Sequence, residues 1–252
     1  MGQLALACLP FAACAALATV AQNLTGFAFA LVLLGLVGLF DLVPLADAAD
    51  ASSMLTLVHA AIHFGGSGLT PHWRVMRPVL WTTPLGVAAG VFLLAWLSSG
   101  ALSTLRAVLG LVIVVSAIVL VTNARRRDIV SGPTPFAIAG AVSGLMGGLF
   151  ASPGPPLVYH MYRQPLEPSV VRQCLLLVFA ANAALRLLMV GFAGRLSLDA
   201  VVLALAAAPA VAGANLWLRR SVRVDHGATL RVLVAALLVA AGAILVVDGI
   251  GA

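Results

Sequence analysis

The amino-acid sequence is built from ten apolar runs that are separated by short polar stretches. About 20 apolar residues cross the hydrocarbon core of a bilayer as a helix, so each run is long enough for a full or a partial span. The runs lie at 4–21, 24–42, 51–66, 78–98, 101–122, 134–150, 154–162, 168–191, 197–218 and 228–248. This pattern predicts an all-α polytopic membrane protein with eight to ten membrane segments.

The composition excludes several other classes of protein. Only 9% of the 252 residues are charged and 62% are hydrophobic, whereas a soluble domain carries about 25% charged residues. A soluble enzyme, a nucleic-acid-binding module and a disordered chain are therefore excluded. The net charge of +6 comes from arginines clustered between apolar runs, which is typical of membrane orientation signals. Three cysteines inside apolar runs show no spacing typical of disulfides or metal ligands.

The second half of the chain repeats the first with an interval of 125 residues. The segment 10–12 (Pro-Phe-Ala) recurs at 135–137, and the segment 104–106 (Thr-Leu-Arg) recurs at 229–231. Pro84 and Pro209 are separated by the same interval. We interpret residues 1–123 and 129–252 as two transmembrane repeats.

The arginine clusters predict that the repeats have opposite orientations. Clusters at 125–127 and 219–223 are expected in the cytoplasm, so run 101–122 enters the cytoplasm and run 228–248 leaves it. The acidic segment 41–50 and both termini then lie on the extracytoplasmic side of a bacterial inner membrane, with Arg195 as an exception. Inverted repeats are the architecture of secondary transporters, which bind substrate near the midplane where the halves meet.

Both repeats are interrupted at the same position. No charge marks a return to water at 22–27 or at 147–156, and the second stretch contains three prolines, which cannot continue a helix. Such paired interruptions predict a binding site, and a helix that starts there suits an anion. The polar side chains at the two interruptions can donate hydrogen bonds without carrying charge: Gln22, Asn23, Thr25 and Ser152. The alternative is that these side chains only cap the interrupted helices.

Residues 140–157 resemble the glycine-rich signature of the sulfite exporter TauE/SafE family, also called the toluene sulfonate uptake permeases. The resemblance rests on glycines at 140, 144, 147 and 148, followed by Leu-Phe-x-Ser-x-Gly-Pro-Pro-Leu. Residues 22–31 resemble the counterpart of this signature in the first half. The chain departs from the usual pattern at Ala28 and Ala151, where glycine is common. The resemblance covers nearly the whole chain.

The resemblance implies a transporter of sulfur-containing or organic anions, of the sulfite, sulfoacetate or sulfonate type. Combined with the inverted repeat, it predicts alternating access across the bacterial inner membrane, coupled to protons or sodium. The residues expected to bind the substrate are Gln22, Asn23, Thr25, Gly26, Ser152, Gly154, Pro155 and Asn182. We expect no cofactor, no metal site, no nucleic-acid partner and no enzymatic activity; the partners are the small anion and the lipid bilayer.

Other polar residues inside the apolar runs are candidates for a pathway or for proton coupling. They are His59, Tyr159, His160 and Arg186. A charged residue inside a membrane span is costly and indicates function, although Arg186 could instead extend its side chain to the membrane surface. For Tyr162 we favour a place in the interfacial aromatic belt, and for Asn215 a structural role.

Several alternatives stay open from the sequence alone. The chain could be a permease of another substrate class, similar to drug and metabolite exporters. An intramembrane enzyme around Ser143 is a weaker alternative, because no partner histidine is well placed. The direction of transport, the oligomeric state, and whether the first two helices of each repeat span or re-enter the membrane are not fixed by the sequence.

Overall fold

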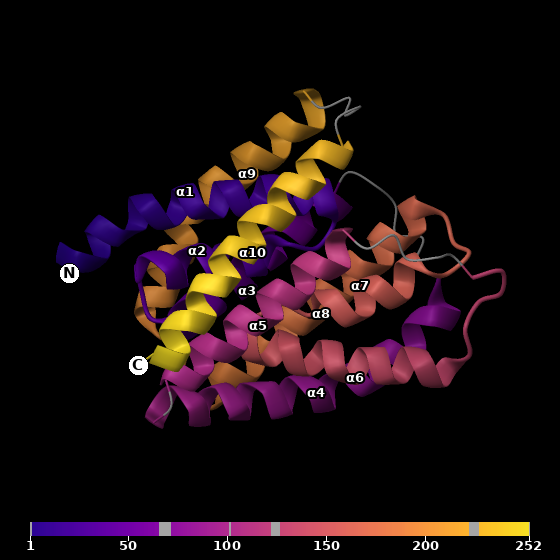
Figure 1. Cartoon of the computed structure of the whole chain (residues 1–252), viewed down its shortest axis with the longest axis horizontal. Coiled ribbons are helices and arrows are strands. Elements are labelled where there is room, and N and C mark those ends of the chain that lie inside the picture. The colour runs from indigo at the N-terminus through magenta and orange to yellow at the C-terminus, as the bar shows by residue number, and fades with distance from the viewer. Residues whose placement is uncertain (1, 66–71, 101, 122–126, 222–226, 252) are drawn as a thin grey trace.

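The computed structural model describes residues 2–65, 72–100, 102–121, 127–221 and 227–251, which form helices and no strand (Figure 1). In chain order these helices are α1 (Gly2–Thr25), α2 (Phe29–Phe40), α3 (Leu45–Phe64), α4 (Trp73–Gly100), α5 (Leu102–Val121), α6 (Pro133–Phe150), α7 (Gly154–Tyr162), α8 (Pro168–Phe192), α9 (Leu198–Ser221) and α10 (Gly227–Gly251). Among the described residues, α1, α4, α6, α8 and α9 are long and apolar enough to cross a bilayer. The prediction of an all-α polytopic membrane protein is confirmed.

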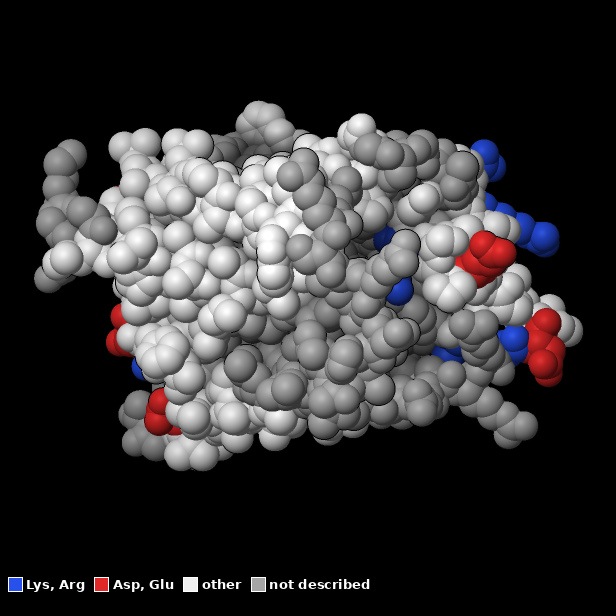
Figure 2. All heavy atoms as spheres, turned by 90° about the horizontal axis from the view of Figure 1, so that it is seen from above, with Lys and Arg blue, Asp and Glu red and all other residues white. Residues whose placement is uncertain are grey.

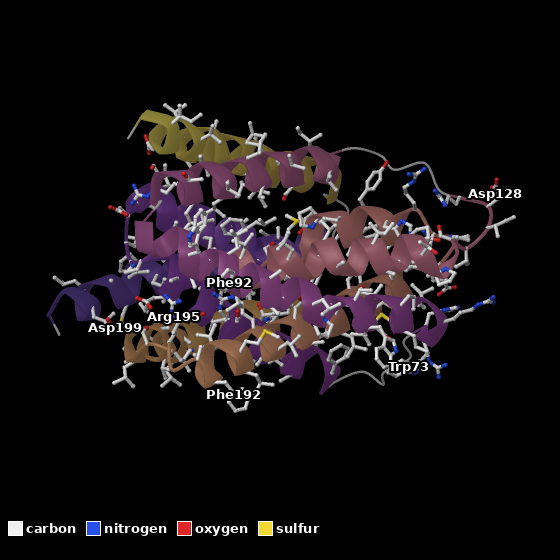
Figure 3. The ribbon with its side chains drawn as sticks, turned by 90° about the horizontal axis from the view of Figure 1, so that it is seen from below. Trp73, Phe92, Asp128, Phe192, Arg195 and Asp199 are labelled. Atoms are coloured by element: carbon white, nitrogen blue, oxygen red, sulfur yellow. The ribbon has the colours of Figure 1, made fainter. Side chains whose placement is uncertain are left out.

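Charged side chains gather toward two ends of the molecule, with a largely uncharged surface between them (Figure 2). We call one end the arginine face, where α4, α6 and α8 begin and α3 and α7 end. We call the other end the acidic face, where α3, α5 and α9 begin and α2, α8 and α10 end. Figure 3 shows Trp73 and Asp128 at the first end and Arg195 and Asp199 at the second.

At the acidic face, an ion pair and a hydrogen bond between side chains connect the ends of neighbouring helices. Asp41 follows α2 and forms an ion pair with Arg106 of α5 at 2.6 Å. The hydroxyl of Ser197, just before α9, donates a hydrogen bond to Asp47 of α3 at 2.6 Å. The helix α3 begins at Leu45, after Pro44, and therefore takes in Asp50, which the sequence had indicated as part of a polar loop.

The helices α6 and α7 form a re-entrant hairpin. Before α6, the backbone N–H of Ser131 donates to Oε1 of Gln164 at 2.9 Å, and Gln164 follows α7 by two residues. The hairpin therefore enters and leaves at the arginine face. Nine residues of α7 extend about 14 Å, which is less than half of a bilayer core of about 30 Å.

The helices α1 and α2 form the matching hairpin from the acidic face. Both α1 and the short, 12-residue α2 have their outer ends on this side of the molecule (Figure 1). The hairpin shape of both pairs supports the re-entrant alternative that the sequence left open, while α1 and α6 are themselves long enough to cross a bilayer. The other described helices, α3, α4, α5, α8, α9 and α10, run between the two faces.

The helix boundaries and the helix neighbours follow the interval of 125. The helices α2, α4 and α5 begin at 29, 73 and 102, and α7, α9 and α10 begin at 154, 198 and 227. Helix α1 packs on α9, and its counterpart α6 packs on α4, while α3 packs on α8 and α5 on α10. This exchange of partners supports the proposal of two inverted repeats, and it shows that the first and second parts of the chain interlock.

Candidate functional site

The tips of the two hairpins touch inside the helix bundle. The first tip turns at Gly26 with φ of 88°, and the second turns at Ala151, 125 residues later, with φ of 53°. A Cβ atom built on Gly154 at the second tip would lie 2.9 Å from Cδ2 of Phe27 at the first tip. The structure therefore brings together the two interruptions that the sequence singled out.

The polar side chains of the first tip bond to the beginning of α2. The Oε1 atom of Gln22 accepts a hydrogen bond from the N–H of Phe29 at 3.0 Å. The hydroxyl of Thr25 donates to the carbonyl of Ala21 at 2.8 Å and lies 3.3 Å from the N–H of Ala28. The contacts to Phe29 and Ala28 satisfy N–H groups at the start of α2 that the interruption would otherwise leave unpaired, whereas the bond to Ala21 lies within α1. Gln22 and Thr25 thus match the capping alternative.

The second tip contains two buried polar atoms without a hydrogen-bond partner, Oγ of Ser152 and Oδ1 of Asn182. Asn182 reaches this tip from α8, because a Cβ on Gly147 would lie 2.5 Å from its Oδ1 atom. Its amide group donates to the carbonyl of Val178 at 3.1 Å. Buried polar atoms are almost always paired, so two such atoms beside one helix interruption indicate a place for a ligand or water.

The beginning of α7 offers fewer donors than a helix start normally has. Gly154 is its first residue, and Pro155 and Pro156 follow. Proline has no N–H, so the first turn presents only the amides of Gly154 and Leu157. The expected cluster of backbone donors is therefore smaller at this tip, and side chains such as Ser152 have to supply part of it.

A chain of hydrogen bonds joins the first tip to α9 and α3. Nδ2 of Asn23 donates to Oδ1 of Asn215 at 2.9 Å, and Nδ2 of Asn215 lies 3.0 Å from Nδ1 of His59. Asn215 is buried, whereas Asn23 stays partly exposed. The sequence had given Asn215 a structural role, and it had no means of placing this residue beside Asn23, 192 positions away.

Arg186 is buried in the bundle and forms an ion pair with Asp50. Only 1% of Arg186 is exposed, and its Nε atom donates to the carbonyl of Gly148 at 3.0 Å. Its Nη1 atom contacts Oδ1 of Asp50, which is also buried. The alternative in which Arg186 reaches the membrane surface is wrong. The sequence missed Asp50, because the partner that compensates its charge is 136 residues away.

The aromatic candidates on α7 point in two directions, toward the arginine face and toward the first tip. The ring of Tyr159 lies under the guanidinium of Arg163, 5.3 Å away, and His160 packs edge-on against Phe136 at 4.6 Å. Both contacts lie toward the arginine face. Tyr162 instead reaches the first tip, where its hydroxyl lies 3.3 Å from a Cβ built on Gly26. The interpretation of Tyr162 as an interfacial anchor is therefore wrong.

Ser143 has a structural contact at the second tip. Its hydroxyl is buried and donates to the carbonyl of Pro153, which lies between α6 and α7. This bond fixes the proline-rich turn and uses the hydroxyl that an enzymatic mechanism would need. No group of three or more metal-ligating side chains occurs in the part of the chain that the structure describes.

Comparisons with known proteins identify relatives over nearly the whole chain. The family model described as sulfite exporter TauE/SafE matches residues 11–245. A protein of Cupriavidus necator named "Probable sulfite/organosulfonate exporter TauE" is 31% identical over 234 residues, which cover 93% of this chain and 91% of the relative. No solved structure matches.

Proposed function

The chain belongs to the sulfite exporter TauE/SafE family, and from this premise we propose that it moves a small sulfur-containing or organic anion across the bacterial inner membrane. The family consists of transporters, so the chain is a multi-pass membrane transporter and not an enzyme. Sulfite, sulfoacetate and sulfonates are the proposed substrates, in line with the name of the relative from Cupriavidus necator.

The observation that carries this proposal is the pair of unpartnered buried atoms at the touching hairpin tips. The hydroxyl of Ser152 can donate to an oxyanion. Oδ1 of Asn182 can accept from a protonated oxyanion or from a water that accompanies it. Both groups are uncharged, so they can bind an anion and release it again without breaking a buried ion pair. We assign Gly26, Gly154 and Pro155 to the backbone of this site.

We infer that transport proceeds by alternating access. The contact between Phe27 and Gly154 closes the passage between the hairpins, so substrate can pass only when the tips separate. Each hairpin packs on a long helix of the other repeat, α1 on α9 and α6 on α4, and these pairs are the proposed moving units. Because loops rich in arginine lie on the cytoplasmic side of membrane proteins, we place the arginine face in the cytoplasm and both termini on the extracytoplasmic side.

Proton coupling through His59 is the proposed source of energy, with sodium as the alternative. Asn215 donates to Nδ1 of His59 and thereby holds the neutral ring, since a protonated Nδ1 cannot accept this bond. Protonation would break the bond and release Asn215, which also holds Asn23 at the first tip. Flux in proteoliposomes should respond to an imposed pH gradient, and a His59→Gln variant should lose this response. An undiminished response to an imposed sodium gradient alone would overturn proton coupling.

The substrate class is tested by thermal stabilisation of the purified protein in detergent. The ligands to compare are sulfite, sulfate, thiosulfate, sulfoacetate, taurine, p-toluenesulfonate, acetate and chloride. A ligand of the folded state raises the melting temperature by mass action. We expect a selective rise with a sulfur oxyanion or a sulfonate, whereas a rise only with acetate or chloride would contradict the assigned class.

The site is tested by flux of the same anion into proteoliposomes. Ser152→Ala and Asn182→Leu should each lower the flux at least tenfold, because each removes an atom that has no other partner in the protein. The control is Ser53→Ala, a buried serine whose hydroxyl already donates to the carbonyl of Ala49 at 2.9 Å. Normal flux in both variants would contradict the assignment of Ser152 and Asn182 to the substrate site.

A further inference from the structure

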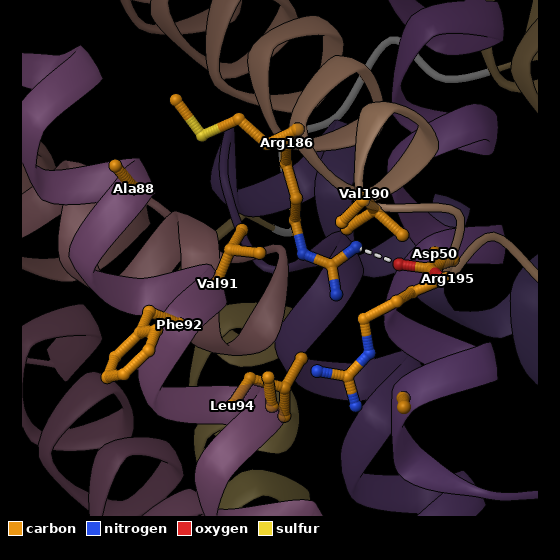
Figure 4. A pocket seen from close by; sticks show the side chains of 12 residues that line it. Asp50, Ala88, Val91, Phe92, Leu94, Arg186, Val190 and Arg195 are labelled. Carbon is orange, nitrogen blue, oxygen red and sulfur yellow. Dashed lines mark hydrogen bonds and ion pairs between the residues drawn. The ribbon is translucent and has the colours of Figure 1, made fainter.

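A cavity lies between α3, α4 and α8, near the acidic face. It has a volume of about 340 Å³ and contains three charged side chains, Arg186, Arg195 and Asp50. Figure 4 shows the guanidinium groups of Arg186 and Arg195 on one side of it, with Asp50 bonded to Arg186 and with Val91, Phe92 and Leu94 nearby. Its lining includes Met189 and Val190 near the end of α8 and Arg195 beyond it, so the cavity lies toward the acidic face and away from the hairpin tips.

The charges in this cavity leave one positive charge without a partner. Asp50 compensates Arg186 through their buried ion pair. Arg195 is exposed, and among the described residues its guanidinium has no ion pair and no side-chain hydrogen bond. Two guanidinium groups and one carboxylate give a net charge of +1. The lining charges therefore favour a monovalent anion, while Asp47, one turn before Asp50, lies outside the lining and accepts a hydrogen bond from Ser197.

The rest of the lining is apolar. Side chains of α4 and α8 form this part of the wall, among them Val91, Phe92, Leu94, Met189 and Val190. Apolar surface contributes about 25 cal/mol for each Å² that a ligand covers, so this wall favours an anion with an apolar body over a bare oxyanion. The cavity volume exceeds what one small organic anion needs, which leaves space for water around its charged group.

We propose that this cavity is a second anion-binding site, an outer vestibule that holds an organic monovalent anion on its way to or from the hairpin tips. Arg195 forms the first contact with the anion. Asp50 occupies Arg186 in the empty state and competes with the anion for that guanidinium. The link from Arg186 to the second tip is direct, since its Nε atom donates to the carbonyl of Gly148, two residues before the end of α6.

This inference rests on the proposed function for its physiological ligand, but its test does not depend on transport. A cysteine introduced by Ala193→Cys lines the rim of the cavity, and Cys8→Ser removes the one described native cysteine that is not fully buried. The rate of labelling by a membrane-impermeant maleimide is measured in detergent with increasing p-toluenesulfonate. We expect saturating p-toluenesulfonate to slow the labelling at least fivefold, and methanesulfonate to need about tenfold higher concentrations.

Variants in the same labelling assay separate the vestibule from the tips. Arg195→Gln should raise the half-protecting concentration about tenfold, because it removes a charged hydrogen-bond donor. Arg106→Gln is the matched control, an arginine on the same face that belongs to another ion pair, and it should leave this concentration unchanged. Asn182→Leu should also leave it unchanged, although it lowers the flux at least tenfold under the proposed function.

Two results would overturn the vestibule. One is labelling at position 193 that p-toluenesulfonate does not slow in the Cys8→Ser, Ala193→Cys protein. The other is protection that Arg195→Gln and Arg106→Gln weaken equally, because a general charge effect would then explain it. If the protection follows the expected pattern while Asn182→Leu transports normally, the vestibule stands and the proposed site at the tips fails.

Discussion

The two hairpins are built on the same plan, yet their supporting helix pairs differ. Helix α6 meets α4 through glycines, so the backbones approach closely; a Cβ on Gly90 would lie 2.9 Å from Cα of Gly148. At the equivalent positions, α1 meets α9 through Asn23 and Asn215, which bond to each other at 2.9 Å. One hairpin is therefore held by close packing of backbones, and the other by a hydrogen bond between side chains.

The same contrast appears around α3 and α8, which pack on each other at the centre of the repeat. Asp50 and Arg186 form a buried ion pair on one side. The positions related to them by the interval of 125 are Leu175 and Ala61, which are apolar. A charged pair therefore supports only the second hairpin, through the carbonyl of Gly148. The polar groups thus differ between the two parts of the chain, while the arrangement of the helices is alike.

The largest effect on stability should come from replacing Asp50 with leucine, the residue at the equivalent position 175. Asp50→Leu leaves Arg186 buried without a carboxylate, which destabilises a protein by about 3–5 kcal/mol. The double variant Asp50→Leu/Arg186→Met removes both charges and should recover most of this loss. Unfolding in detergent, followed by circular dichroism, measures both. A double variant less stable than the single one would contradict this account of the ion pair.

The next effect tests whether the α4 and α6 pair depends on close approach. Gly90→Ala would place a Cβ 2.8 Å from the N atom of Leu149 on α6, so the helices must separate, at a cost of about 3 kcal/mol. The matched control is Gly213→Ala in α9, where a Cβ meets nothing within 4 Å. The control should leave the melting temperature unchanged or raise it slightly. Equal losses in the two variants would show that helix spacing is not the cause.

A smaller effect is expected at the polar pair of α1 and α9. Asn215→Leu leaves Asn23 and His59 without this partner, which should cost about 2 kcal/mol. Replacing both asparagines, in Asn23→Leu/Asn215→Leu, should cost less than the sum of the single variants. Thermal melts of the three variants and the unchanged protein form a double-mutant cycle. Strictly additive losses would show that the two side chains do not stabilise each other.

The smallest effect compares the turns at the two tips. Ala151 has a positive φ that glycine adopts without strain, so Ala151→Gly should stabilise the protein by about 0.5–1 kcal/mol. The reverse change at the equivalent residue, Gly26→Ala, should destabilise it, because the backbone is strained and the hydroxyl of Tyr162 is close. Melting temperatures measure both changes. A lower melting temperature for Ala151→Gly would contradict the assigned turn geometry.

The sequence by itself determined the helical class, the membrane location and the positions of both interruptions. Long apolar runs leave a chain no other way to satisfy its backbone in lipid. The prolines at 153, 155 and 156 together interrupt the helix at the second tip, whereas single prolines stay inside α1, α4 and α9. The interval of 125 likewise follows from local patterns, and it agrees with the helix boundaries in the structure. Ser152 was identified as a candidate because it lies at the second interruption, and Asn182 because a polar residue is conspicuous in the apolar run 168–191.

Only the tertiary structure decided which of these polar residues have partners. Gln22 and Thr25 cap α2, whereas Ser152 and Asn182 keep a free atom, and that difference depends on geometry within a few ångströms. Asp50 and Arg186 meet across 136 residues, and Asn215 meets Asn23 across 192. A single sequence shows which polar groups are costly to bury. The contacts that compensate this cost form between helices that are distant in the chain, so only the tertiary structure shows them.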